Sequence, residues 1–504
     1  MGIERKPMRK CAGISTFLLL SAAFVMASFV CVGPAYAARI QTGVVVTAAQ
    51  DYTSGATSVI SVDPVGGPRS VQNNLLPTIS DLGLSAYNRY FYRVEKYNAD
   101  NVTKFDIDAP ATPIWQYSTQ DTGEFESSNP YQLVFVNSEK AYLLRYGSTK
   151  AWIVNPSTTT EAGFKIGELD LSAYADADGA PEMAAGVITN GKLFIMMERL
   201  ENWCPSTTAY VAVFDVATDT EIDTGLGEGG RKGIPLPIKD PVGIHYLPDN
   251  ETIYVLGKGP YPGSCAPQYD YTGGIISLDP VSYATAMIVD DGDAEHHPYG
   301  VLTGMEVISS TKGYFVGYAG WGDNSLYTFD TSTGLVAGPL DAFKNISIGG
   351  MNSGLGLDQN DMLWVTNQTH ARIDIVNTLD DTIDESLGTN LNPQAVAFCI
   401  QLVSKYLYVK PDGQCDGMIP CYATVQDAVI AAETVDIIRI AQADYPEDVV
   451  VNEAKKITFQ SGWNAGYEEP SGESMIHSLV LIDGTLVLDK GRLVAAGRIA
   501  LPAQ

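Results

Sequence analysis

The sequence predicts an all-β protein built around a closed, seven-bladed β-propeller, followed by a small C-terminal module with one helix. Three observations predict the propeller. A pattern of strands recurs about every 50 residues, and each unit holds about four strands. The first and last units are both incomplete, and each contains the strands that the other lacks. Such a ring has no exposed strand edges, because its two ends pair in one sheet.

The chain begins with a segment that is typical of an export signal. Four basic residues lie within the first ten positions and precede an uncharged run over 11–32. Ala35-Tyr36-Ala37 then forms a small-x-small cleavage site. We therefore expect residues 1–37 to be a signal peptide cleaved after Ala37, and the mature protein to be periplasmic, secreted or on the cell surface. An uncleaved anchor is the alternative, because the run is long enough to span a bilayer.

The repeat is clearest in the predicted first strand of each unit. It is found as "DLGLSAY" (81–87), "YQLVFVN" (131–137), "AAGVITN" (184–190), "VGIHYLP" (242–248), "GMEVISS" (304–310), "SGLGLDQ" (353–359) and "QAVAFCI" (394–400). A second strand follows after a short turn, as in "AYLL" and "IYVL". After the seventh first strand no second strand of this kind follows. The N-terminal "VVVT" (44–47) and "SVISVD" (58–63) supply it and a third strand, which predicts that the two ends of the ring meet.

The predicted third strands end on an Asp or Asn, at Asp63, Asp106, Asn155, Asp215, Asp279, Asp330 and Asn377. Such a side chain accepts a hydrogen bond from the backbone of the following turn, and three prolines then stop the strand. The pattern over about 40–400 resembles YVTN-type seven-bladed propellers of exported bacterial proteins. That resemblance implies the fold and no particular activity, and we place the propeller at residues 38–401.

Residues 402–504 follow another pattern. Val425, Ala428, Val429 and Ala432 fall at helical spacing on one face, and Thr424 precedes them as a predicted N-cap. Short predicted strands follow, including "DVVVN", "KITFQ", "SLVLI" and "TLVLD". This segment resembles the start of a pectin-lyase-like, right-handed parallel β-helix with a capping helix. The resemblance and the exported context imply a local disulfide between Cys415 and Cys421. An ordinary helix covering a small sheet is the alternative.

The long loops of the propeller are predicted to lie on one face, because they precede first strands or join second to third strands. They belong to blades four to six and include "ERLENWCPSTT", "GKGPYPGSCAPQYDYTG" and "DDGDAEHHPYG". Cys204 and Cys265 occupy equivalent loops of neighbouring blades, which predicts a disulfide between them. Cys399 is then left as a buried thiol.

Aromatic residues gather in these loops, and they are our predicted binding residues: Trp203, Tyr261, Tyr269, Tyr271, Tyr299, Tyr318 and Trp321. Their flat faces and polar edges suit sugar rings or protein partners. The alternative is that they pack the long loops against the ring.

Oxygen ligands and imidazoles are candidates for a metal or for catalysis. Asp290, Asp291, Asp293 and Glu295 form an acidic loop, and "DADG" (176–179) with Glu182 has some ligands of a calcium loop, so Ca²⁺ is a candidate ion. No other cofactor is expected. His245, in an innermost strand, and His296 and His297, in the acidic loop, are the candidate catalytic residues. A solvated loop and a structural histidine are the simpler interpretations.

The chain has a formal net charge of −28, so nucleic acid is not an expected partner. We expect an exported binding or scaffolding protein of the cell envelope that holds a protein or glycan through the loops of blades four to six. A propeller enzyme of hydrolase, lyase or dehydrogenase type is one alternative. Polysaccharide binding by the C-terminal module is another. We expect no transmembrane segment after signal cleavage.

Overall fold

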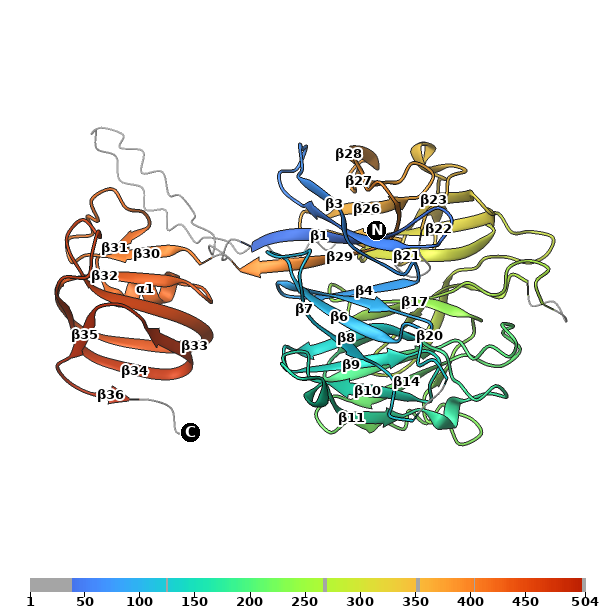
Figure 1. Cartoon of the computed structure of the whole chain (residues 1–504), viewed down its shortest axis with the longest axis horizontal. Coiled ribbons are helices and arrows are strands. Elements are labelled where there is room, and N and C mark those ends of the chain that lie inside the picture. The colour runs from blue at the N-terminus through green and yellow to red at the C-terminus, as the bar shows by residue number, and fades with distance from the viewer. Residues whose placement is uncertain (1–38, 124–125, 266–269, 350–353, 403, 501–504) are drawn as a thin grey trace, which may run out of the picture. The chain divides into compact units, whose positions relative to one another are not determined.

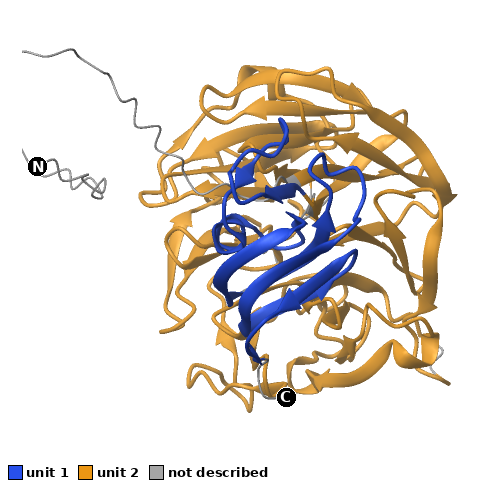
Figure 2. Ribbon diagram, turned by 90° about the vertical axis from the view of Figure 1, so that its left-hand side faces the viewer, with its two compact units in different colours: residues 1–37, 405–504 blue, residues 38–404 orange. Residues whose placement is uncertain are grey.

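The computed structural model describes residues 39–123, 126–265, 270–349, 354–402 and 404–500, which form two compact units, 38–404 and 405–504 (Figures 1 and 2). The predicted signal peptide lies outside the described residues. Within them, no helix has the length and apolar character needed to cross a membrane.

The first unit is a seven-bladed β-propeller of antiparallel sheets. Blade one consists, from the inner to the outer strand, of β29 (Asn392–Leu402), β1 (Arg39–Ala48), β2 (Gly55–Ser61) and β3 (Val71–Thr78). Blades two to four are β4 (Leu82–Tyr87), β5 (Tyr90–Glu95), β6 (Asn101–Asp106), β7 (Pro113–Ser118); β8 (Pro130–Asn137), β9 (Lys140–Arg145), β10 (Lys150–Val154), β11 (Lys165–Asp170); and β12 (Met183–Thr189), β13 (Lys192–Met197), β14 (Tyr210–Asp215), β15 (Thr220–Glu221), with β16 (Ile234–Pro235) paired to β14. Blades five to seven are β17 (Pro241–Leu247), β18 (Thr252–Gly257), β19 (Gly274–Leu278), β20 (Thr285–Val289); β21 (Val301–Ser309), β22 (Lys312–Gly320), β23 (Asp323–Phe329), β24 (Val336–Ala337); and β25 (Leu355–Leu357), β26 (Met362–Asn367), β27 (Arg372–Asn377), β28 (Thr382–Gly388).

The ring closes as the sequence predicts. β1 pairs antiparallel with β29 along its whole length, with Thr42 opposite Cys399 and Val45 opposite Val396 (Figure 1). β1 and β2 are therefore the second and third strands of a sheet whose first strand comes from the other end of the unit. Cys399 is fully buried and unpaired, as expected, and burial raises the pKa of its thiol to about 12.

The Asx caps are confirmed in blades two to seven. There the Asp or Asn at the end of the third strand accepts a backbone N–H from the turn that follows: Asp106, Asn155, Asp215, Asp279, Asp330 and Asn377. Blade one differs, because the Asp63 carboxylate accepts from the Asn360 side chain at 3.0 Å. These short turns, together with those between first and second strands, leave one face of the ring almost without long loops.

Lysines link neighbouring blades on that short-turn face. Lys140, Lys192 and Lys312 each open a second strand and donate to a backbone carbonyl in the turn after the third strand of the next blade, at 2.6–3.1 Å. Lys312 also pairs with Asp381 at 2.7 Å. The lysine at this repeated position thus links neighbouring blades.

The second unit is a parallel sheet with one helix. Its strands are β30 (Tyr406–Val409), β31 (Cys421–Tyr422), β32 (Ile437–Ala441), β33 (Ala443–Trp463), β34 (Glu473–Leu488), β35 (Arg492–Ala495) and β36 (Ile499–Ala500). The predicted separate strands "DVVVN" and "KITFQ" are one strand here, and so are "SLVLI" and "TLVLD". The reason is that the ladder between β33 and β34 continues through register shifts near Asn452 instead of breaking at them.

The helix α1 (Val425–Ala431) has the predicted cap and face. The Thr424 side chain accepts from the backbone N–H of Asp427 at 3.0 Å. All four residues of the predicted apolar face are at most 3% exposed and belong to the core of this unit. The Cys415–Cys421 disulfide is present, and the hydroxyl of Tyr467 lies 3.4 Å from the Cys415 sulfur.

Candidate functional site

The face that carries the long loops also carries four pockets. A central pocket of about 490 Å³ is lined by blades one to five, and a groove of about 770 Å³ by blades six, seven and one. A pocket of about 500 Å³ adjoins the central one and shares Tyr146, Leu200 and Trp203 with it. A fourth, of about 300 Å³, lies between blades five and six.

In every blade, one position in the repeat supplies a residue to either the central pocket or the groove. This is the residue that directly follows the second strand. In blades two to five it is Lys96, Tyr146, Glu198 and Lys258, and all four line the central pocket. In blades six, seven and one it is Trp321, Gln368 and Ala49, and all three line the groove. The ring is therefore divided into a charged arc and an uncharged arc.

A backbone hydrogen bond fixes this position in the charged arc. The N–H groups of Lys96, Tyr146, Glu198 and Lys258 donate to the carbonyls of Asp81, Asn129, Glu182 and Asp240, at 2.9–3.1 Å. Each acceptor precedes an inner strand. The residues that follow the second strands are thereby held in place at the central pocket.

Glu198 is the most deeply placed carboxyl of the central pocket. It is 6% exposed, and Tyr146 donates a hydrogen bond from its hydroxyl to Glu198 Oε2 at 2.7 Å. Burial, reinforced by the negative charge of Asp240, raises the pKa of Glu198 well above its ordinary value. Burial therefore favours the protonated form of this carboxyl.

Two lysines lie near the Glu198 carboxyl, and one of them is held more tightly than the other. Lys258 pairs with Asp240 at 2.9 Å; burial opposes its charge, but the attraction of Asp240 prevails and raises its pKa. Lys96 lies 3.6 Å from Asp81 and 4.2 Å from the centre of the Tyr131 ring, and burial lowers its pKa. Lys258 is thus a fixed cation, whereas the contacts of Lys96 are looser.

The carboxylates of the "DADG" segment do come together. Ligand oxygens of Asp176, Asp178 and Glu182 lie within 4.8 Å of one another, and this is the one such group among the described residues. Burial raises the pKa of Glu182 to about 8, and Glu182 also accepts from the backbone N–H of Leu200 at 3.1 Å. A calcium ion here remains a prediction.

The acidic loop after β20 is organised as turns. Asp290 and Asp293 accept backbone N–H groups of their own loop, which lowers the pKa of Asp293. Asp291 is fully buried and accepts from the Gly273 N–H at 3.1 Å, and burial raises its pKa to about 7. These carboxylates and Glu295 do not converge on one point among the described residues. A metal ion in this loop stays a prediction.

Two predicted binding residues project from the face. Trp203 is 78% exposed and borders the central pocket and its neighbour, and Trp321 is 85% exposed at the groove. The structure therefore brings these indoles to hollows, as a binding role requires.

The other predicted aromatics pack against one another around the pocket between blades five and six. Tyr261 lies 4.9 Å from Tyr318, Tyr271 stacks on His297 at 4.1 Å, and Tyr299 packs edge-on against Phe315 at 5.4 Å, ring centre to ring centre. Tyr269 lies outside the described residues. Loop packing explains most of this group.

His245 has a partner that the sequence pattern missed. Its Nδ1 lies 3.4 Å from Glu306 Oε1, from the inner strand of the next blade. Burial lowers the pKa of His245 to about 4 and raises that of Glu306 to about 8. Both groups are uncharged near neutral pH. His296 and His297 are exposed in the acidic loop and are not part of this pair.

We expect Glu306→Gln to remove part of the pH dependence of stability. An acid whose pKa rises from 4.5 to about 8 on folding binds more protons in the folded state, so its stabilisation is complete below 4.5 and is lost as the pH rises towards 8. His245 acts in the opposite sense, but only below its ordinary value of 6.5. Urea unfolding between pH 6.5 and 8 therefore isolates the contribution of Glu306 to the pH dependence. The variant should gain stability relative to the wild type as the pH rises. Glu251→Gln, at an exposed position, is the control. If the stability of Glu306→Gln changed with pH in parallel with that of the wild type, the raised pKa of Glu306 would be refuted.

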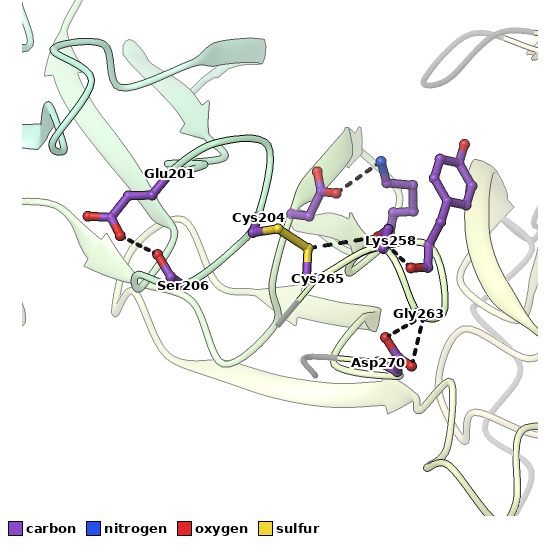
Figure 3. Close-up of a disulfide and its surroundings, with 10 residues drawn as sticks. Glu201, Cys204, Ser206, Lys258, Gly263, Cys265 and Asp270 are labelled. Atoms are coloured by element: carbon purple, nitrogen blue, oxygen red, sulfur yellow. Dashed lines mark hydrogen bonds and ion pairs between the residues drawn. A yellow bond between two sulfur atoms is a disulfide. The ribbon is translucent and has the colours of Figure 1, made fainter. Parts of the chain in front are cut away.

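The predicted disulfide between loops of blades four and five is present. Cys204 and Cys265 are bonded, with Cα atoms 5.8 Å apart (Figure 3). Ser206 donates to Glu201 at 2.6 Å beside it, and Gly263 donates its N–H to Asp270 at 3.1 Å. The bond thereby fixes the loop that carries Trp203 to the loop that follows Lys258.

No model of a protein family and no curated protein matches this chain. Solved structures with a similar fold include apo AztD from Citrobacter koseri, at 13% identity and a TM-score of 0.45 over 72% of this chain and 99% of that one. A putative 6-phosphogluconolactonase from Bacteroides fragilis has 11% identity and a TM-score of 0.49 over 71% and 98%. Virginiamycin B lyase from Staphylococcus aureus has 13% identity and a TM-score of 0.40 over 63% and 91%. These similarities concern the propeller fold alone, and the resemblances to YVTN-type propellers and to pectin-lyase-like β-helices remain predictions.

Proposed function

We propose that this protein is an exported ligand-binding propeller that takes a small polar ligand, or a polar group of a larger partner, into the central pocket. One observation carries the proposal: four successive blades place Lys96, Tyr146, Glu198 and Lys258 at the same structural position around one hollow of about 490 Å³. A volume of this size is typical of small-molecule sites.

The pocket combines apolar walls with a few converging polar groups. Leu84, Ala184 and Ile244 line it from three inner strands, and Trp203 borders its mouth. The amine of Lys96 donates hydrogen bonds in either protonation state, and burial favours the protonated form of Glu198, which also donates. We therefore expect a ligand with an apolar face and at least two acceptor oxygens.

The two disulfides favour export, because such bonds persist in oxidising compartments. This agrees with the predicted signal peptide and with a role in the cell envelope. The loops of blades four to six, on the same face as the pocket, are the proposed contact surface for a protein or glycan partner.

The proposal is tested with purified mature protein and a panel of sugars, hydroxy acids and amino acids in thermal-shift titrations. A ligand present at 100 times its Kd adds about 2.7 kcal/mol of stability, which is readily detected as a higher Tm. We expect at least one compound to raise the Tm of the wild type, and Glu198→Gln and Lys96→Met to abolish that response. Glu251→Gln, in a short turn of the opposite face, should retain it. A panel without any response, or a response that both pocket variants keep, would contradict the proposal.

A second candidate function, acid catalysis, is favoured by the burial of Glu198 in the central pocket, which raises the pKa of its carboxyl well above the ordinary value. A buried carboxyl with a raised pKa is the form that a general acid requires. Glu198 replaces His245, His296 and His297 as the leading catalytic candidate, since it lines the central pocket and they do not. Turnover of any compound that binds the wild type, and its loss in Glu198→Gln with binding retained, would distinguish an enzyme from a binding protein.

A further inference from the structure

The groove where blades six, seven and one meet differs in chemistry from the central pocket. It has a volume of about 770 Å³, and its described lining contains no Asp, Glu, Lys or Arg. This is unusual on a chain with a net charge of −28. A charged ligand would find no opposite charge in the groove, and an anion would also be repelled by the protein as a whole.

The groove is rich in side-chain amides that the fold leaves unused. Gln50, Asn390 and Asn392 line it, and their side chains make no hydrogen bond with other described residues. Each amide offers two N–H donors and one carbonyl acceptor. Sugar hydroxyl groups donate and accept at once, so they match these amides without any charge.

Trp321 supplies an apolar surface on a well-defined support. β22 and β23 remain paired up to Gly320 and Asp323, so Trp321 and Gly322 form a two-residue hairpin turn. Gly322 has a φ of +74°, a conformation that side chains disfavour and that the second central residue of a type II turn requires. The indole is 85% exposed, and Tyr52, 47% exposed, lines the same groove. Such rings offer a flat apolar face with a polar edge, which suits the C–H face of a pyranose.

The wall formed by blade seven is already ordered. Ser347 donates from its hydroxyl to Gln368 Oε1 at 2.9 Å, and Gln368 Nε2 donates to the Pro393 carbonyl of blade one at 3.3 Å. These bonds hold Gln368 in one orientation and join two blades beneath the groove. A ligand would meet a surface that loses little entropy on binding.

From these features we propose that the groove binds a neutral oligosaccharide. One sugar ring stacks on Trp321, and hydroxyl groups of neighbouring rings pair with Gln50, Asn390 and Asn392. This site is distinct from the central pocket, with which it shares Tyr52. It adds a ligand class to the protein without using Lys96, Tyr146, Glu198 or Lys258.

The test titrates the mature protein with cellotetraose, maltotetraose and chitotetraose, and with tetragalacturonate as the acidic counterpart. We expect saturable calorimetric binding of at least one neutral tetrasaccharide, and binding of tetragalacturonate that is at least about tenfold weaker. Trp321→Ala should weaken neutral binding at least about tenfold, the scale of one lost aromatic contact, while Trp321→Phe should keep most of it. Gln50→Ala with Asn392→Ala should weaken it further.

Trp203→Ala is the matched control, because Trp203 is a similarly exposed indole on the same face but borders the central pocket. It should leave oligosaccharide affinity unchanged, as should Glu198→Gln. The proposal is overturned if none of the neutral tetrasaccharides binds, if tetragalacturonate binds as tightly as they do, or if Trp203→Ala and Trp321→Ala weaken binding equally. The last outcome would show that sugar binding is not confined to the groove, and the Glu198 and Lys96 variants would then measure the share of the central pocket separately.

Discussion

Replacing Trp364 with alanine is expected to lower the free energy of unfolding of the propeller by about 3–5 kcal/mol, the usual cost of removing a fully buried tryptophan. Trp364 is 0% exposed, and its indole N–H donates to Asp358 Oδ2 at 2.9 Å. Its ring meets Phe398 of β29 edge-on at 5.2 Å, and a Cβ added at Gly43 of β1 would come within 2.5 Å of it. The indole therefore fills the space between blade seven and the sheet that closes the ring.

Circular dichroism in urea measures this loss without relying on tryptophan fluorescence. Trp321→Ala is the control, because that exposed side chain should contribute within about 0.5 kcal/mol. Gly43→Val approaches the same contact from the other side and should cost about 1–3 kcal/mol by overpacking. If Trp364→Ala were no more destabilising than Trp321→Ala, Trp364 would not pack against the closing blade as described.

Removing the Cys204–Cys265 disulfide is the second change with a large expected effect. The bond spans 61 residues, and the loss of such a cross-link typically costs 2–4 kcal/mol, because the unfolded chain gains conformational freedom. The Cys204→Ser, Cys265→Ser double variant should therefore unfold at markedly lower urea concentration. The loop with Trp203 should also become more mobile, since the bond ties it to the neighbouring blade.

Cys415–Cys421 is the matched comparison, since it spans only 6 residues in the other unit and its removal should cost less. A reducing agent should lower the stability of the wild-type propeller to that of the double variant. It should leave the stability of the double variant's propeller unchanged. Equal stability of the wild type and the double variant would show that the bond does not hold blades four and five together.

Loss of the Cys204–Cys265 disulfide should also affect ligand binding, because the bonded loops lie at the central pocket. A protein that loses this disulfide should keep the inner wall of the central pocket, built from strands, but lose order at its mouth. We therefore expect weaker ligand binding in the double variant with a smaller change in selectivity. The groove of blades six, seven and one lies on other loops, so oligosaccharide binding there should survive.

Part of the site was open to prediction from the repeat itself. Glu198, Tyr146 and Lys258 each lie two residues beyond the second-strand segments "LFIM", "AYLL" and "IYVL". Comparing that column across units would have found the charged arc. Our prediction followed the long loops and their aromatics instead, and so it identified Trp203 and Trp321 but missed the residues that line the pocket wall.

The sequence by itself determined the elements whose signals are local or repeated: the propeller strands, the Asx caps of blades two to seven, the capped helix, both disulfides and the closure of the ring. Only the tertiary structure decided which polar groups meet. His245 and Glu306 lie on inner strands of adjacent blades, and Glu198 meets Tyr146 across another pair of blades. The physical reason is that alternation and turns act within one blade, whereas these contacts depend on how each sheet twists and on how far neighbouring blades are offset around the ring.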